Sequence, residues 1–186
     1  MPEFLEAFNE NNHSLGFTQN RRLIHENGHW HRTAQVYILN ERGELLCNFR
    51  HSSKDVFPDL WDLSIGGHLN PGENYEDCAT REMAEELGVS LTPPEMVYAG
   101  TISLDGYDTI TGLIDREHAG VFVWRTSREA SSFDYQRDEI TELRFFPLSV
   151  LRQNLQFDQP DIPIIPLREK FLQILDLLEE RFLNTV

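Results

Sequence analysis

The chain has 186 residues and a mass of 21.7 kDa, which is enough for one domain with a full core and too little for two domains of ordinary size. Apolar residues make up 40% and charged residues 25% of the sequence, which excludes a disordered or fibrous chain. Lys and Arg number 16 against 31 Asp and Glu, and the resulting formal charge of -15 opposes binding to a nucleic acid polymer.

The first third of the chain predicts an extension, a hairpin and a further strand. Residues 1 to about 30 form the extension, which has a short amphipathic start. Apolar and polar residues then alternate from Thr33 to Leu39, a turn follows at residues 40–43, and a second strand runs from Leu45 to Phe49. Residues 61–65 are predicted as another strand, and the glycines that follow predict a loop.

A helix with one apolar face comes next. Asn74 has the side chain of an N-cap, Asp77 follows three residues later, and Gly88 is placed as the helix stop. Apolar residues recur at four-residue steps between these ends, at Ala79, Met83 and Leu87. The spacing therefore predicts a helix that packs against a core.

The second half of the chain mixes strands and helices. We predict strands at residues 97–102, 121–124 and 142–146, a short helix opening at Pro147, and an amphipathic C-terminal helix over about residues 167–183. This mixture predicts an α/β sandwich around a mixed sheet. No repeat or linker divides the chain, so we expect a single domain over residues 1–186.

The cysteines and the apolar segments indicate the cellular compartment in which the protein is expected. Cys47 and Cys78 lie inside regular-looking segments, which favours packing thiols in a reducing compartment over a disulfide. The first residues have no signal-peptide pattern, and no segment reaches about 18 apolar residues. We therefore expect a cytoplasmic protein without a membrane partner. The apolar face of the C-terminal helix is compatible with an oligomer.

Three carboxylates share one face of the helix before Gly88. Glu82, Glu85 and Glu86 lie at about 0°, 300° and 40° around the helix axis. Like charges at this spacing destabilise a helix by roughly 0.2 to 0.5 kcal/mol per pair, and Arg81 alone cannot neutralise three of them. A hard divalent cation such as Mg²⁺ would do so and would keep positions open for a phosphate. A solvated acidic face is the alternative interpretation.

The residues around these glutamates carry a resemblance. From Gly67 to Val89 the sequence is GHLNPGENYEDCATREMAEELGV, which resembles the signature of the Nudix hydrolase superfamily, the Nudix box. The specified positions that match are Gly67, Glu73, Arg81, Glu82, Glu85, Glu86 and Gly88. At usages of about 5 to 7% per residue, a chance match has odds on the order of 10⁻⁸ to 10⁻⁹ per starting position.

The resemblance implies an α/β/α sandwich in which residues 67–89 form a loop, a helix and a loop. It also implies hydrolysis of the phosphoanhydride of a small diphosphate compound, a nucleoside di- or triphosphate or another diphosphate-linked metabolite, with Mg²⁺ or Mn²⁺. The residues it marks as catalytic are Arg81, Glu82, Glu85 and Glu86, with the three glutamates as metal ligands. Glu73 would support the loop, and Gly67 and Gly88 would shape the backbone. Which glutamate acts as the base stays open.

Beyond the box, the chain resembles the branch that contains type I isopentenyl-diphosphate isomerase and its hydrolase-like relatives, over roughly residues 15–150. The isomerase has a proton-transferring cysteine at the position of Gly66, and glycine cannot transfer a proton. No tryptophan follows Trp124, so the isomerase's aromatic cation stabiliser has no counterpart. We therefore expect hydrolysis. One alternative is isomerase-like activity. The other is a sensor that binds a phosphorylated ligand without turnover, and the intact set of three glutamates argues against this sensor.

The same branch suggests a second metal site. The histidine positions of the isomerase site match His25, His31 and His68, and its acidic positions match Asp115 and Glu117. Such a set suits Zn²⁺ or Mn²⁺, in a structural role or with Glu117 as the base. The alternative is that the histidines are ordinary polar residues near strand ends.

Three basic residues are candidates to bind the diphosphate by the same resemblance: Arg21, Arg50 and Lys54. Ordinary surface charge is the alternative for each of them. Two aromatic residues, Phe57 and Trp61, are expected to pack in the fold rather than to stack on a nucleobase.

Overall fold

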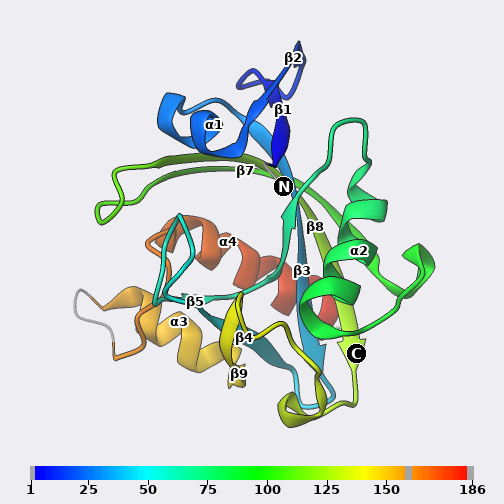
Figure 1. Ribbon diagram of the computed structural model, residues 1–186. Helices are drawn as coiled ribbons and strands as arrows, with labels where there is room; N and C mark the ends of the chain where they lie inside the picture. Colours follow the sequence, from blue (N-terminus) through cyan, green and yellow to red (C-terminus); the bar gives the residue numbers. More distant parts are fainter. Residues whose placement is uncertain (1–2, 158–160, 184–186) are drawn as a thin grey trace.

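A seven-stranded mixed sheet forms the centre of the computed structural model, which describes residues 3–157 and 161–183 (Figure 1). Its main strands lie in the order β5-β4-β3-β8-β7, while β6 pairs with β3 and β9 with β4. Strands β3 and β8 run parallel and the other pairs are antiparallel. The strands of this sheet are β3 (His31–Asn40), β4 (Glu44–Arg50), β5 (Trp61–Asp62), β6 (Ile65–His68), β7 (Val97–Tyr107), β8 (Ile114–Thr126) and β9 (Ile140–Pro147).

The predicted hairpin is the pair β3 and β4, in register through Leu39 and Leu45. Its turn is held by the Asn40 side chain, whose Oδ1 accepts from the backbone N–H groups of Arg42 at 3.0 Å and Glu44 at 2.9 Å. The strand predicted at residues 61–65 is instead two short strands. The Asp62 carboxylate accepts from the backbone N–H of Ser64, and beyond this turn the chain changes its pairing from β4 to β3.

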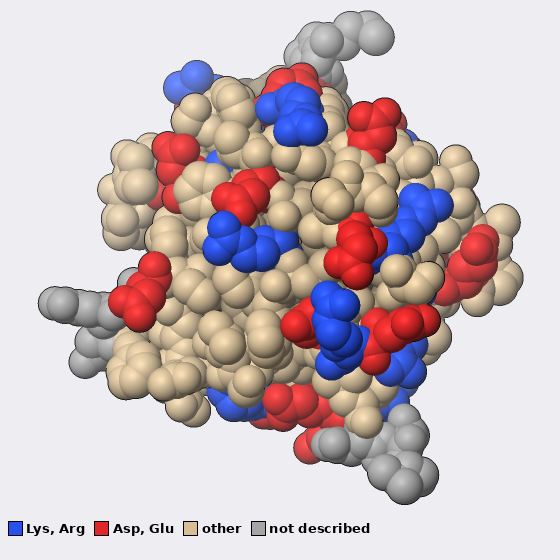
Figure 2. Space-filling model, turned by 90° about the horizontal axis from the view of Figure 1, so that it is seen from below, with Lys and Arg blue, Asp and Glu red and all other residues tan. Residues whose placement is uncertain are grey.

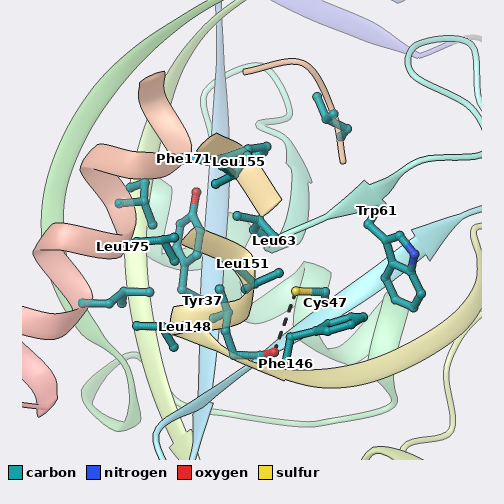
Figure 3. Close-up of a cluster of buried hydrophobic side chains, with 14 of the residues drawn as sticks. Tyr37, Cys47, Trp61, Leu63, Phe146, Leu148, Leu151, Leu155, Phe171 and Leu175 are labelled. Carbon is teal, nitrogen blue, oxygen red and sulfur yellow. Dashed lines mark hydrogen bonds between the residues drawn. The ribbon is translucent and has the colours of Figure 1, made fainter. Parts of the chain in front are cut away.

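Helices cover both faces of the sheet, so the predicted α/β/α sandwich is confirmed (Figure 1). The alternation along β3 decides which side chain faces which layer. Ala34, Val36 and Ile38 pack on the side of α2 (Tyr75–Leu87). Tyr37 and Leu39 point the other way, toward α3 (Leu148–Gln156) and α4 (Arg168–Leu178), where Figure 3 shows Tyr37 among Leu151, Phe171 and Leu175.

Helix α2 begins and ends as predicted. The Asn74 side chain accepts from the backbone N–H of Asp77 at 2.8 Å, which satisfies one of the free N–H groups at the helix start. Gly88 adopts the left-handed conformation with φ 65°, and its backbone N–H donates a hydrogen bond to the carbonyl of Ala84. The apolar stripe of Ala79, Met83 and Leu87 is fully buried.

The N-terminal extension is regular structure, for which the sequence indicated only an amphipathic start. Strands β1 (Phe4–Phe8) and β2 (Ser14–Asn20) pair antiparallel, and helix α1 (Arg21–Asn27) follows with Asn20 as its N-cap. Leu5, Ala7 and Ile24 form a small core of their own. In Figure 1 this unit lies against the β7–β8 side of the sheet, and α1 contacts β8.

The predicted C-terminal helix is α4 continued by a π-helical turn at Glu179–Leu183, and short 3₁₀ turns lie at Pro93–Glu95 and Ala130–Ser132.

Cys47 and Cys78 are buried free thiols, as expected of packing residues. No helix in the described part of the chain is both long and apolar enough to cross a membrane. Figure 2 shows one face on which acidic and basic side chains are interspersed, so the charge of -15 makes no single-signed patch there.

Candidate active site

A cavity of about 430 Å³ joins the two predicted sites. Its lining comes from α1, the first half of β3, the loop after β4, strand β6, helix α2, strand β8 and the segment that leads into α4. Most of the predicted residues line it: Arg21, His25, Arg50, Lys54, Gly67, His68, Arg81, Glu82, Glu85, Glu86, Asp115 and Glu117. His31 and Glu73 do not line the cavity but contact the lining residues Asp115 and Arg81, respectively. Gly88 is the C-cap of the helix.

Arg81 connects the loop of the Nudix box to its helix. Its Nε and Nη2 donate to the two carboxylate oxygens of Glu73, each at 3.0 Å, and Nη2 also donates to the His68 carbonyl at 2.9 Å. Its Nη1 donates to Glu82 at 2.5 Å and to Glu85 at 3.0 Å. One guanidinium therefore fixes the orientation of three carboxylates, a geometry that the planar five-donor group of arginine permits.

The three helix carboxylates differ in burial. Glu82 and Glu86 are 8% and 9% exposed, whereas the Glu85 side chain is 56% exposed. A Cβ added at Gly67 would lie 2.5 Å from Glu82 Oε1, so any other residue there would displace this carboxylate. Burial raises the pKa of Glu82, although Arg81 opposes the rise. Burial also raises the pKa of Glu86 to about 7, against the attraction of Lys54.

This raised pKa predicts that divalent metal binding at the box depends on pH. A carboxylate must lose its proton to act as a ligand, and Glu86 is mostly protonated below a pKa of about 7. We expect Mg²⁺ affinity to rise about tenfold between pH 6 and pH 8 and then to level off. Calorimetric titration in two buffers of different ionisation enthalpy would count the released proton. The Glu86→Gln variant should bind weakly and without this pH dependence, and a flat wild-type profile would contradict the assignment.

The histidine cluster contributes to the same cavity through His25 and His68. The ring centroids of His25, His31 and His68 are 4.9 to 5.4 Å apart, and one ligand atom of each lies within 4.8 Å of those of the others. The ligand atoms of His31, Asp115 and Glu117 also lie within 4.8 Å of one another. Among the described residues, His31 Nε2 and Asp115 Oδ1 are buried polar atoms without a hydrogen-bond partner.

The protonation states at this cluster suit metal ligands. Burial lowers the pKa of His31 to about 3, with the neighbouring His68 acting in the same direction, so its imidazole is neutral. Burial alone would raise the pKa of Asp115, but the surrounding imidazoles, His25 first, lower it to about 2. A neutral imidazole such as that of His31 and an ionised carboxylate such as that of Asp115 are the forms that bind Zn²⁺ or Mn²⁺. The unpartnered atoms and this donor chemistry fit such an ion.

Glu117 is held from the sheet by residues that the sequence did not single out. Its Oε2 accepts from Thr33 Oγ1 at 3.0 Å and from Gln35 Nε2 at 3.1 Å, and the Tyr37 hydroxyl donates to Gln35 Oε1 at 2.9 Å. Burial raises the pKa of Glu117, and the nearby Asp115 adds to the rise. No sequence motif marks Gln35, because its contact with Glu117 arises only where β3 pairs with β8.

The three predicted phosphate-binding residues reach the cavity, but each has a partner in the protein. Arg50 donates through Nε and Nη2 to the carbonyls of Phe57 at 3.0 Å and Val56 at 2.8 Å, so it holds the loop after β4. Lys54 pairs with Glu139. Arg21 pairs with Glu3 at 3.2 Å. A phosphate bound by these side chains would therefore compete with existing contacts.

The two aromatic residues pack as predicted. Trp61 is 6% exposed and makes edge contacts with the rings of Phe49 and Phe146. Phe57 is 3% exposed and forms part of the cavity wall with its φ at 50°, in the left-handed region. Neither ring is an exposed platform for a nucleobase.

Fold and site together define a class of protein, an α/β/α enzyme in which a helix of carboxylates faces a deep cavity. The NUDIX domain family model matches residues 29–167, and the chain belongs to this family. The predicted enzyme class, a Nudix pyrophosphohydrolase, is thereby confirmed.

Two relatives are similar to this chain in sequence, and one solved structure is similar to it in fold. An uncharacterized Nudix hydrolase of Clostridium acetobutylicum is 35% identical over 144 residues, which cover 76% of this chain and 68% of that protein. An isopentenyl-diphosphate Delta-isomerase of Streptomyces coelicolor is 34% identical over 119 residues, or 64% of this chain and 59% of the isomerase, less than two thirds of its length. A crystal structure of a Deinococcus radiodurans protein aligns with a TM-score of 0.68 at 20% identity and covers 94% of this chain and 98% of its own.

Proposed function

We propose that this chain hydrolyses the phosphoanhydride of a small diphosphate compound with Mg²⁺ bound by Glu82, Glu85 and Glu86. The observation that carries the proposal is the contact set of Arg81, which orients Glu82 and Glu85 in the lining of the cavity. A bound divalent ion supplies neutralisation of phosphate charge and a water of lowered pKa.

The chain's own residues would bind and orient the substrate. Glu73, through Arg81, ties the loop at residues 70–73 to the helix, and the backbone N–H of Asn70 donates to Glu73 at 2.8 Å. Lys54 lies on the loop opposite the helix and would attract the diphosphate. A carboxylate within the Glu85 and Glu86 pair would accept the proton of the attacking water.

The cavity walls support a substrate with two chemically different ends. The lining combines carboxylates and basic side chains with six apolar residues: Val56, Phe57, Leu104, Ile165, Leu167 and Phe171. A diphosphate suits the charged side chains. The apolar residues favour an organic group with apolar surface over a nucleobase that needs hydrogen bonds at its edge.

The histidine cluster supports a second ion, Zn²⁺ or Mn²⁺, on His25, His31, His68, Asp115 and Glu117. This cluster favours the isomerase-like alternative, but Gly66 opposes it. A Cβ added at Gly66 would collide with the backbone carbonyl oxygen of Ala34 on the neighbouring strand. The position therefore has no room for the cysteine that isomerisation would need.

The test is a hydrolysis screen of the full chain with Mg²⁺, with Mn²⁺ as comparison, in which chromatography detects phosphate, pyrophosphate and monophosphate products. The panel should contain nucleoside di- and triphosphates, nucleotide sugars, and diphosphate esters of apolar alcohols. Metal-dependent turnover of at least one diphosphate is expected. Binding without turnover across the panel would favour the sensor alternative, and conversion of isopentenyl diphosphate to its allylic isomer at enzyme-like rates would favour the isomerase.

A further inference from the structure

The N-terminal strand brings a carboxylate to the histidine cluster. Glu3 Oε1 lies 3.1 Å from His68 Nδ1, and Glu3 Oε2 lies 3.2 Å from Arg21 Nη1. The backbone fixes this placement, because the Glu3 carbonyl accepts from the Arg21 N–H at 2.9 Å and from the Asn20 side chain at 3.4 Å. Glu3 lies outside the residues that match the family model.

All three histidines of the cluster have one ring nitrogen engaged by an oxygen. His25 Nδ1 lies 2.8 Å from the Arg21 carbonyl, His31 Nδ1 lies 3.1 Å from the His29 carbonyl, and His68 Nδ1 lies 3.1 Å from Glu3. A proton on Nδ1 leaves the Nε2 lone pair for a metal. His31 Nε2 has no hydrogen-bond partner among the described residues and lies 3.7 Å from Asp115 Oδ1, as two ligand atoms of one ion would.

Glu3 differs from the other two acceptors because it is a carboxylate side chain rather than a backbone carbonyl. One of its oxygens lies 3.1 Å from His68 Nδ1 and the other 3.2 Å from the Arg21 guanidinium. A charged acceptor on Nδ1 increases the basicity of Nε2 more than a neutral carbonyl does. Arg21 occupies the second oxygen and prevents the carboxylate from rotating away.

We propose that Glu3 is a positioning residue for the second metal site, where its contact with His68 Nδ1 orients that imidazole and strengthens it as a ligand. The proposal rests on the second site of the proposed function. It assigns a role to the N-terminal extension, which delivers Glu3, Arg21 and His25 to the cavity. Arg21 then acts on Glu3 as well as facing the substrate.

Metal titration of the metal-free full-length chain tests the proposal without an activity assay. Zn²⁺ affinity is measured by competition with a chromophoric chelator for the wild type, Glu3→Ala, Glu3→Gln, His68→Ala and Glu6→Ala. Glu6 is the matched control, because it lies on the same strand and its carboxylate accepts only from Ser14 in the described contacts. We expect Glu3→Ala to weaken binding about 10- to 100-fold, Glu3→Gln to lie between it and the wild type, and Glu6→Ala to bind as the wild type does.

Three outcomes would overturn the proposal. Glu3→Ala could bind Zn²⁺ as tightly as the wild type, or more tightly, which would make Glu3 a competitor of the ion. Glu6→Ala could lose as much affinity as Glu3→Ala, which would indicate a general effect of the strand. The wild type and His68→Ala could bind Zn²⁺ with equal affinity, which would show that His68 belongs to no metal site. None of these results bears on Mg²⁺-dependent hydrolysis at Glu82, Glu85 and Glu86. The hydrolysis assay alone tests the proposed function. Circular dichroism and thermal midpoints without metal show whether each variant is folded.

Discussion

Replacement of Glu86 by glutamine is expected to lower kcat/KM for Mg²⁺-dependent hydrolysis by about 10² to 10⁴-fold while the fold is retained. Glutamine has nearly the same size but cannot carry the negative charge that a hard cation requires. Because Glu86 is buried and has a raised pKa, the neutral amide should cost the fold little. Glu85→Gln should lower the rate to a similar extent, since its carboxylate belongs to the same metal-binding face.

Glu76→Gln is the matched control for both variants, because Glu76 is exposed in the first turn of the same helix. Its rate should stay within about twofold of the wild type. Rates are measured by chromatography of the hydrolysis products under saturating Mg²⁺, with thermal midpoints recorded in parallel. Near-normal turnover in both Glu85→Gln and Glu86→Gln would refute metal binding at this helix.

Replacement of Arg81 by lysine is expected to lower kcat/KM by about 10²-fold and to destabilise the protein by about 1 to 3 kcal/mol. Lysine keeps the charge but has a single ammonium, which cannot donate to both oxygens of Glu73 while it also reaches Glu82 and the His68 carbonyl. The loop and the helix would lose their common donor. The carboxylates would then repel one another with less compensation.

Arg152→Lys provides the comparison. Arg152 of α3 pairs with Asp176 of α4 and with Glu179 of the π-helical turn that follows, and its side chain is 26% exposed, the same as that of Arg81. Chemical denaturation and hydrolysis kinetics of the two variants separate a general arginine-to-lysine effect from a specific one. Equal losses of rate in both would contradict the proposed role of Arg81.

The sequence predicts structure best where the structure is local. The helix of the Nudix box has the predicted N-cap at Asn74 and the predicted end at Gly88, because both depend on hydrogen bonds within one turn. The sequence predicts less where pairing between distant strands decides the structure. The strand predicted at residues 61–65 is divided because its two halves pair with different strands. The two strands of the N-terminal extension are not predicted by the sequence. The alternation of Leu15 and Phe17 with polar residues is short, and both strands depend on the pairing of β1 with β2.

In the candidate site, too, the local arrangement is predicted by the sequence and the distant contacts are not. The spacing of Glu82, Glu85 and Glu86 already placed three carboxylates on one helix face, because 3.6 residues complete a turn. Only the tertiary structure decided that Glu82 and Glu86 are buried and Glu85 is largely exposed, since burial depends on loops that arrive from elsewhere in the chain. It also decided that Arg50 is bound to carbonyls and that Glu3 reaches His68. The sequence by itself determined which chemical groups are present, whereas their ionisation and orientation depend on neighbours that only the folded chain supplies.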